Sequence, residues 1–123
     1  MKVSIIVVLY KTPKNEIIRI KSEVQQLDLK SYKLLFIDNT KINRGYAGAI
    51  NKGIKLSKKF NPDVYVIAND DISLLKLKKS ELFKASECFD IWGFSLKQNQ
   101  NMRYGGEIDK LRLSGGLISK KPK

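Results

Sequence analysis

Three nearly continuous runs of β-branched and apolar residues mark the first half of the chain, at residues 2–10, 33–37 and 64–68. Runs of this kind are typical of strands that are covered on both faces. The two segments between them, residues 13–29 and 45–59, carry apolar residues at helical spacing instead. These residues are Ile17, Ile20, Val24 and Leu27 in the first segment and Ala47, Ile50 and Ile54 in the second. The order β-α-β-α-β predicts an α/β fold with a parallel sheet and crossover helices.

The start of the first helix has its own local signal. Thr12 precedes Pro13, which predicts a side-chain N-cap followed by proline at the first helical position. The pattern is weaker after residue 75. There we expect a helix over residues 80–89, a strand over 90–96, a loop or hairpin over 98–107, and a strand over 111–119 interrupted at Gly115 and Gly116. Trp92 and Phe94 are expected to be core residues on a strand, and Cys88 a packed, inert thiol.

Length and composition predict one domain over residues 1–123, with a binding core at 1–75 and the remaining sheet and a basic tail at 76–123. Because the chain has one cysteine and no histidine, an internal disulfide, a zinc site and a His-based triad are not expected. The longest strongly apolar stretch, residues 3–10, is too short to cross a bilayer and is not followed by a cleavage signal. We therefore expect a cytoplasmic protein.

The net charge of +12 adds a preference for polyanions such as nucleic acid, anionic lipid or phosphorylated substrates. Most of this charge comes from lysine, which reads bases less well than arginine. The lysines are also spread along the chain, apart from residues 76–79 and the tail at 120–123. We interpret the charge mainly as a source of solubility. A basic nucleic-acid-binding α/β protein is the less favoured alternative.

Polar residues follow each of the three predicted strands. The strand ends are Leu9-Tyr10-Lys11, Asp38-Asn39-Thr40 and Asn69-Asp70-Asp71. Open α/β sheets bind ligands just beyond the carboxyl ends of their strands. Adjacent carboxylates at such a place suit Mg²⁺ or Mn²⁺, which prefer oxygen ligands. Asp70 and Asp71 can equally cap a turn or the next helix, and the pair at residues 38–39 can be a plain strand-ending turn.

A loop with two glycines, residues 43–48, lies between the second and third strands. Gly45 permits close backbone approach to a ligand, and the helix that follows offers free N–H groups to an anion. Arg44 can bond to phosphate, although a solvated loop charge is the more common role for such a residue. Together with the strand-end acids, this loop predicts a site for a nucleotide diphosphate with a bridging metal.

In order along the chain, the segments VSIIVVLY (residues 3–10), FIDN (36–39), NRGYAGAINKG (43–53) and ANDD (68–71) resemble family 2 glycosyltransferases of the GT-A fold, most nearly the rhamnosyltransferase-like branch. The resemblance covers about residues 1–96. It implies a Rossmann-like three-layer sandwich with a mainly parallel central sheet, here truncated or minimal. It also implies a metal-dependent, inverting transfer of a hexosyl group from a UDP- or dTDP-sugar to a glycan or lipid-linked acceptor.

The resemblance assigns roles by position. Asp38 would accept a hydrogen bond from the uracil or thymine N3–H, while Leu9 and Tyr10 line the base site and Asn39 and Asn69 belong to the nucleoside-binding set. Asp71, with Asp70, stands at the metal-binding end of the family's D-x-D or N-x-D motif. Arg44 and Gly45 form the phosphate-facing loop. Asn51 matches an asparagine that supports this loop, and a structural hydrogen bond is the alternative for it.

Two departures from the family pattern limit what the resemblance implies. The family's second acid after the Asp38-Asn39 pair is absent, because Thr40, Lys41 and Ile42 lead directly to Asn43. The family's general base lies further downstream than residue 123, and neither Glu107 nor Asp109 matches its motif. The catalytic residue is thus unassigned, and a non-catalytic nucleotide-sugar-binding or assembly module is the alternative. Peripheral contact with an anionic membrane and homo-oligomerisation both stay open.

Overall fold

The structure is a computed structural model that describes residues 1–98, 100–103, 106–109 and 114–117. The chain, which we expected to form one domain, divides into two compact units, Met1–Cys88 and Phe89–Lys123. Each unit is described by itself below. The predicted site residues all lie in the first unit.

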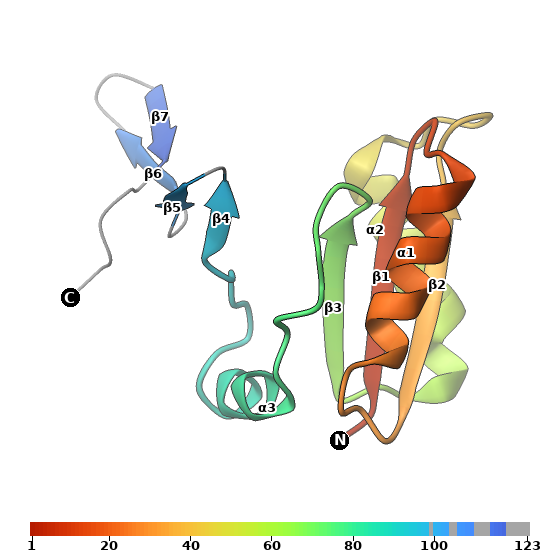
Figure 1. Ribbon diagram of the computed structural model, residues 1–123, viewed down its shortest axis with the longest axis horizontal. Helices are drawn as coiled ribbons and strands as arrows, with labels where there is room; N and C mark the ends of the chain where they lie inside the picture. Colours follow the sequence, from red (N-terminus) through yellow and green to blue (C-terminus); the bar gives the residue numbers. More distant parts are fainter. Residues whose placement is uncertain (99, 104–105, 110–113, 118–123) are drawn as a thin grey trace. The chain divides into compact units, whose positions relative to one another are not determined.

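The first unit is built on a three-stranded parallel sheet (Figure 1). Its strands are β1 (Val3–Leu9), β2 (Tyr32–Asp38) and β3 (Val64–Asn69), in the order β2-β1-β3. β1 pairs with both neighbours along nearly its whole length, and its residues are all buried. The sequence therefore predicted these three strands and the α/β class correctly, to within one or two residues at each end.

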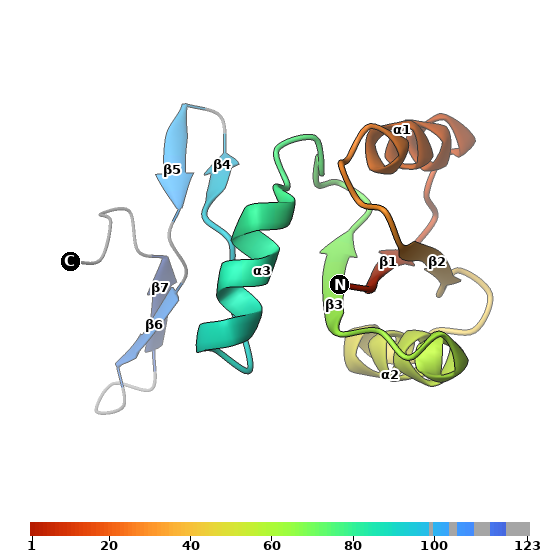
Figure 2. The same cartoon turned by 90° about the horizontal axis from the view of Figure 1, so that it is seen from below.

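Helices α1 (Lys14–Gln25) and α2 (Gly45–Ser57) cover opposite faces of this sheet (Figure 2). Alternate side chains of β1 pack against each helix. Val3, Ile5, Val7 and Leu9 share one apolar cluster with Ile20 and Val24 of α1, whereas Ile6 and Val8 share another with Ala49 of α2. The result is a three-layer α/β/α arrangement, compatible with a minimal Rossmann-like fold.

The start of α1 differs from the prediction. Its N-cap is Pro13, with no side-chain capping bond, so Thr12 does not cap the helix. The Thr12 hydroxyl instead accepts a bond from the Tyr10 N–H at 3.1 Å and donates to the carboxylate of Asp70. A residue that local sequence rules assign to a helix cap is thus used to join the loops after β1 and β3.

The rest of the chain holds α3 (Lys79–Cys88) in the first unit and two small hairpins in the second. β4 (Leu96–Gln98) pairs with β5 (Asn101–Arg103), and β6 (Gly106–Asp109) pairs with β7 (Ser114–Leu117), both antiparallel. The hairpin expected over residues 98–107 is thus present in part. The predicted last strand is β7, which includes the two glycines expected to interrupt it.

The strand predicted over residues 90–96 is wrong, since residues 90–95 form no strand. Trp92 and Phe94 are also not core residues: they are exposed and stack on each other, with ring centroids 5.9 Å apart. Cys88 is exposed, not packed. The basic tail at residues 120–123 lies outside the described residues, as do Gly105 and residues 111–113 and 118–119 of the predicted loop and last strand.

Close packing between α2 and β1 depends on two small residues of the helix. The hydroxyl groups of Ser57 and of Ser4 in β1 form a 2.7 Å hydrogen bond, and both residues are fully buried. One turn earlier, a Cβ on Gly53 would lie 2.6 Å from Cγ2 of Ile6, well inside van der Waals contact. Ile6 is fully buried and β-branched, so it cannot readily move aside.

We predict that Gly53→Ala destabilises the fold by about 1–3 kcal/mol, because overpacking against Ile6 outweighs the gain of up to about 1 kcal/mol in helix propensity. Urea unfolding followed by circular dichroism measures the change. Lys52→Ala, at the exposed neighbouring position, is the control and should change stability little. A Gly53→Ala variant as stable as the control would show that this contact does not limit the helix-to-sheet distance.

Candidate functional site

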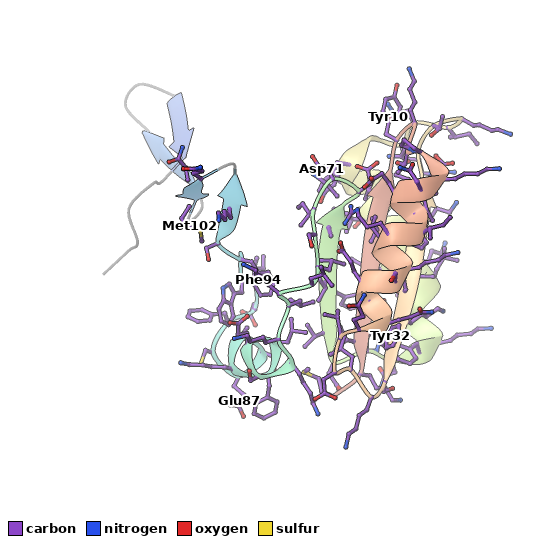
Figure 3. The ribbon with its side chains drawn as sticks, in the orientation of Figure 1. Tyr10, Tyr32, Asp71, Glu87, Phe94 and Met102 are labelled. Carbon is purple, nitrogen blue, oxygen red and sulfur yellow. The ribbon has the colours of Figure 1, made fainter. Side chains whose placement is uncertain are left out.

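The register of the parallel sheet brings the three polar strand ends to one edge. Leu9 pairs with Asp38, and Val8 pairs with Asn69. Two strand spacings of about 4.8 Å place the ends of β2 and β3 about 10 Å apart, on either side of the end of β1. Figure 3 shows Tyr10 and Asp71 at this end of the sheet and Tyr32 at the other.

The predicted site residues at this edge separate into exposed and buried ones. Tyr10, Asp38, Asn69 and Asp71 are exposed and can meet a ligand. Leu9 is buried and belongs to the apolar cluster on the α1 face, so its side chain lies within the core. The exposed set thus contains one acid at the end of β2 and one just beyond β3.

Asn39 is buried, with 4% of its surface exposed, and fastens the loop that leads to α2. Its backbone N–H donates to the Leu9 carbonyl at 2.9 Å, and its Nδ2 donates to the Gly45 carbonyl at 3.1 Å. Its Oδ1 is buried without a hydrogen-bond partner among the described residues. Asn39 therefore joins the end of β2 to the end of β1 through its backbone and to the start of α2 through its side chain.

The loop before α2 is shaped by its own side chains. The Gly45 N–H donates to Oδ1 of Asn43 at 2.9 Å, and Gly45 has a φ of +69°, which favours glycine at this position. Arg44 is half-buried and its Nη1 donates back to the Ile42 carbonyl at 3.1 Å. Asn51, further along α2, is exposed. The N–H of Gly45, the first residue of the helix, is thus bonded to Asn43, and the next N–H groups of the first turn have no intrahelical partners.

Tyr46, the second residue of α2, belongs to the site although the sequence did not single it out. Burial raises the pKa of its hydroxyl, and the nearby carboxylate of Asp71 raises it further. The negative charge of Asp71, just beyond β3, therefore acts on the start of α2. The one signal in the sequence was position, since Tyr46 directly follows the predicted phosphate-facing residues Arg44 and Gly45.

Asp70 and Asp71, adjacent in sequence, are held differently. The carboxylate of Asp70 accepts a hydrogen bond from the Thr12 hydroxyl, and its backbone carbonyl accepts one from Nη2 of Arg19 at 3.0 Å. These bonds join the turn after β3 to the loop after β1 and to α1. Asp71 is exposed, and its charge raises the pKa of Tyr46. Asp70 thus fixes the turn, whereas the side chain of Asp71 is open to solvent.

Glu23 of α1 fixes the segment that follows this turn. Its buried carboxylate accepts bonds from the Leu74 N–H and from Nη1 of Arg19, each at 2.7 Å, and from the Ser73 hydroxyl at 3.2 Å. Burial alone would raise the pKa of Glu23, but the bonds from Leu74 and Arg19 outweigh it and hold the pKa below the ordinary value of 4.5. Glu23 is therefore ionised at neutral pH.

At the other side of the edge, Asp38 is held by the residue two positions later. The Thr40 N–H donates to Oδ1 of Asp38 at 2.8 Å, and the Thr40 hydroxyl accepts from the Lys11 N–H at 2.8 Å. Hydrogen bonds from Thr40 hold the pKa of Asp38 below its ordinary value, and Lys41 contributes in the same direction. Asp38 is thus an exposed, ionised hydrogen-bond acceptor.

Few side chains at this edge of the sheet could bind a metal ion. Within the described part of the chain, no group of three or more His, Cys, Asp or Glu side chains could hold a metal ion. Mg²⁺ commonly takes only one or two carboxylates and completes its shell with phosphate oxygens and water. Asp71, with Asp70 behind it, fits a metal that arrives with a phosphate ligand and does not fit a metal held by protein alone.

Comparison with known proteins adds no relative, since no family model, no curated protein and no solved structure matches the chain. Over the described residues, none of the helices combines the length and the apolar character needed to cross a membrane.

The Glu23 network predicts a specific dependence of stability on acid. Because the pKa of Glu23 is lower in the folded than in the unfolded state, its contribution is complete above the ordinary value of 4.5 and is lost as the pH falls through the folded value. Glu23→Gln should cost about 1–3 kcal/mol at neutral pH, where a buried charge-assisted hydrogen bond is weakened. It should also flatten the decline in stability below pH 4.5.

Urea unfolding across this pH range measures both effects. Glu87→Gln, at an exposed position of α3, is the control and should keep the wild-type profile. A Glu23→Gln variant that declines with acid as steeply as the wild type would contradict the assignment.

Proposed function

We propose that the chain is the donor-binding domain of a GT-A type glycosyltransferase, which binds a UDP- or dTDP-sugar with Mg²⁺ or Mn²⁺. The observation that carries this proposal is the placement of two exposed acids, Asp38 and Asp71, on either side of the end of β1. The loop that leads to α2 leaves β2 just after Asp38, and the charge of Asp71 acts on Tyr46 at the start of α2. Free N–H groups at a helix start bind phosphate.

A nucleoside diphosphate matches this order of groups. Asp38, an ionised acceptor, would take the N3–H of uracil or thymine, with exposed Tyr10 beside it and buried Leu9 and Asn39 supporting the backbone. Asn69 would contact the ribose. The diphosphate would then lie by Gly45 and the start of α2, with Arg44 in the same loop. This arrangement extends from the end of β2 to the end of β3, the full width of the sheet edge.

Asp71, supported by Asp70, would hold the metal. When bound, the metal supplies positive charge that stabilises the leaving diphosphate as the glycosidic bond breaks. The residues of this chain contribute orientation: Thr12 and Arg19 fix the turn through Asp70, which directly precedes the exposed Asp71. No residue of the chain is assigned as the base that would deprotonate the acceptor hydroxyl.

A non-catalytic nucleotide-sugar-binding module is the second candidate. It is motivated by Glu107 and Asp109, which lie on β6 in the second unit and do not match the family's general-base motif. A donor-hydrolysis assay separates the two candidates, because a glycosyltransferase commonly transfers some sugar to water. Binding without hydrolysis favours the module.

We predict that UDP and dTDP bind in a Mn²⁺-dependent manner, and that Asp71→Asn weakens Mn²⁺-dependent binding by about tenfold or more, since one of at most two carboxylate ligands is lost. Isothermal titration with and without Mn²⁺ measures this. Asp28→Asn, which removes an exposed acid elsewhere on the unit, should leave binding unchanged. Folded protein that binds neither nucleotide in the presence of Mn²⁺ would refute the proposed function.

Recognition of the base gives a separate prediction. Cytosine has no N3–H to donate, so CDP should bind roughly tenfold more weakly than UDP if one charge-assisted hydrogen bond is lost at an exposed site. Asp38→Ala should remove the preference and bring the two affinities together. An unchanged preference in Asp38→Ala would assign base recognition to another residue.

A further inference from the structure

We propose that the first unit carries a docking surface for an anionic lipid bilayer, separate from the nucleotide site and formed by the segment from Leu74 to Lys84. The proposal does not depend on the proposed function. It rests on a groove, on half-exposed apolar side chains along that groove, and on a local excess of lysine.

The groove lies where the end of α1 meets the segment before α3 and the first turns of α3. Its volume is about 580 Å³, and its wall is mostly apolar. Its apolar lining includes Leu27, Leu75, Leu77 and Phe83, and its charged lining is Lys78, Lys79 and the acid Asp28. Because they share one groove, Lys78 and Lys79 lie on the same side of the unit as Leu75 and Phe83.

Two apolar side chains of this surface are about half exposed. Leu75 and Phe83 are each 52% exposed, although their neighbours Leu74 and Leu82 are buried in the core at 7% and 2%. Leu74 and Leu82 thus hold the segment on the core, with Leu77 packed against it, while Leu75 and Phe83 are turned outward. Such side chains can enter the boundary between headgroups and acyl chains, where apolar burial stabilises the bound state.

The charge of the segment favours a bilayer as the occupant. Residues 74–84 contain four lysines, Lys76, Lys78, Lys79 and Lys84, against the single acid Glu81, which leaves a local net charge of +3. Each lysine near an anionic leaflet contributes about 1 kcal/mol to binding. Nucleic acid would use the lysines but not the aliphatic side chain of Leu75. A bilayer uses both kinds of side chain at once.

Vesicle flotation with the full chain tests this surface. We expect binding to phosphatidylcholine vesicles that contain phosphatidylglycerol, little binding to phosphatidylcholine alone, and weaker binding at high salt. The double charge reversal Lys78→Glu/Lys79→Glu should weaken binding by at least about tenfold, as should Phe83→Ser. Circular dichroism checks that each variant is folded, which is expected because all three side chains are exposed.

Matched controls use the same substitutions elsewhere on the unit. Lys58→Glu/Lys59→Glu reverses two adjacent exposed lysines next to α2, and Leu56→Ser removes an exposed apolar side chain of α2. Both should bind vesicles nearly as well as the wild type. If the control variants lose as much vesicle binding as the test variants, the binding does not depend on this surface, and the proposal is overturned. A wild-type chain that does not bind the anionic vesicles would also overturn the proposal, and would favour a soluble acidic partner for the groove. UDP titration of the same variants keeps this result distinct from the nucleotide site.

Discussion

The pairing of β1 with both of its neighbours is the constraint on which the rest of the first unit depends. β1 is buried on both faces and is in register with β2 at Leu9–Asp38 and with β3 at Val8–Asn69. A shift of either register by one residue would turn every side chain of the shifted strand to the other face. The same pairing fixes which residues reach the edge of the sheet. Fold and site therefore have a common cause.

Beyond the strands, the site is held by bonds between segments distant in sequence. Thr12 bonds to Asp70 and Glu23 to Leu74, which ties the turn after β3 to the loop after β1 and to α1. Asn39 does the same for the loop before α2. These bonds are made by residues other than the exposed acid Asp71, whereas Asp38 also accepts a bond from the Thr40 N–H. Asp38 and Asp71 are both exposed and can be reached by a ligand.

The sequence predicted well what depends on burial and poorly what depends on a distant partner. The apolar runs located β1, β2 and β3 because strands covered on both faces must be apolar throughout. Thr12 was assigned a local role as a cap, since nothing near it in sequence reveals Asp70, 58 positions away. Residues 90–96 have the composition of a strand, yet a strand also needs a neighbour to pair with, and composition cannot supply one. Tyr46 was missed for the same reason, because its relation to Asp71 exists only in the folded chain.

The central claim is that Asp71 and the start of α2 form one end of a nucleotide-diphosphate site. The most direct measurement is the NMR spectrum of the chain with UDP as Mn²⁺ is added, because paramagnetic Mn²⁺ broadens the signals of nearby nuclei. Broadening of the Asp71 and Tyr46 amide signals at low Mn²⁺, dependent on UDP and absent in Asp71→Asn, is the predicted result. Broadening that is the same with and without UDP, or that is strongest at acids away from this edge such as Asp28 or Asp63, would contradict the claim.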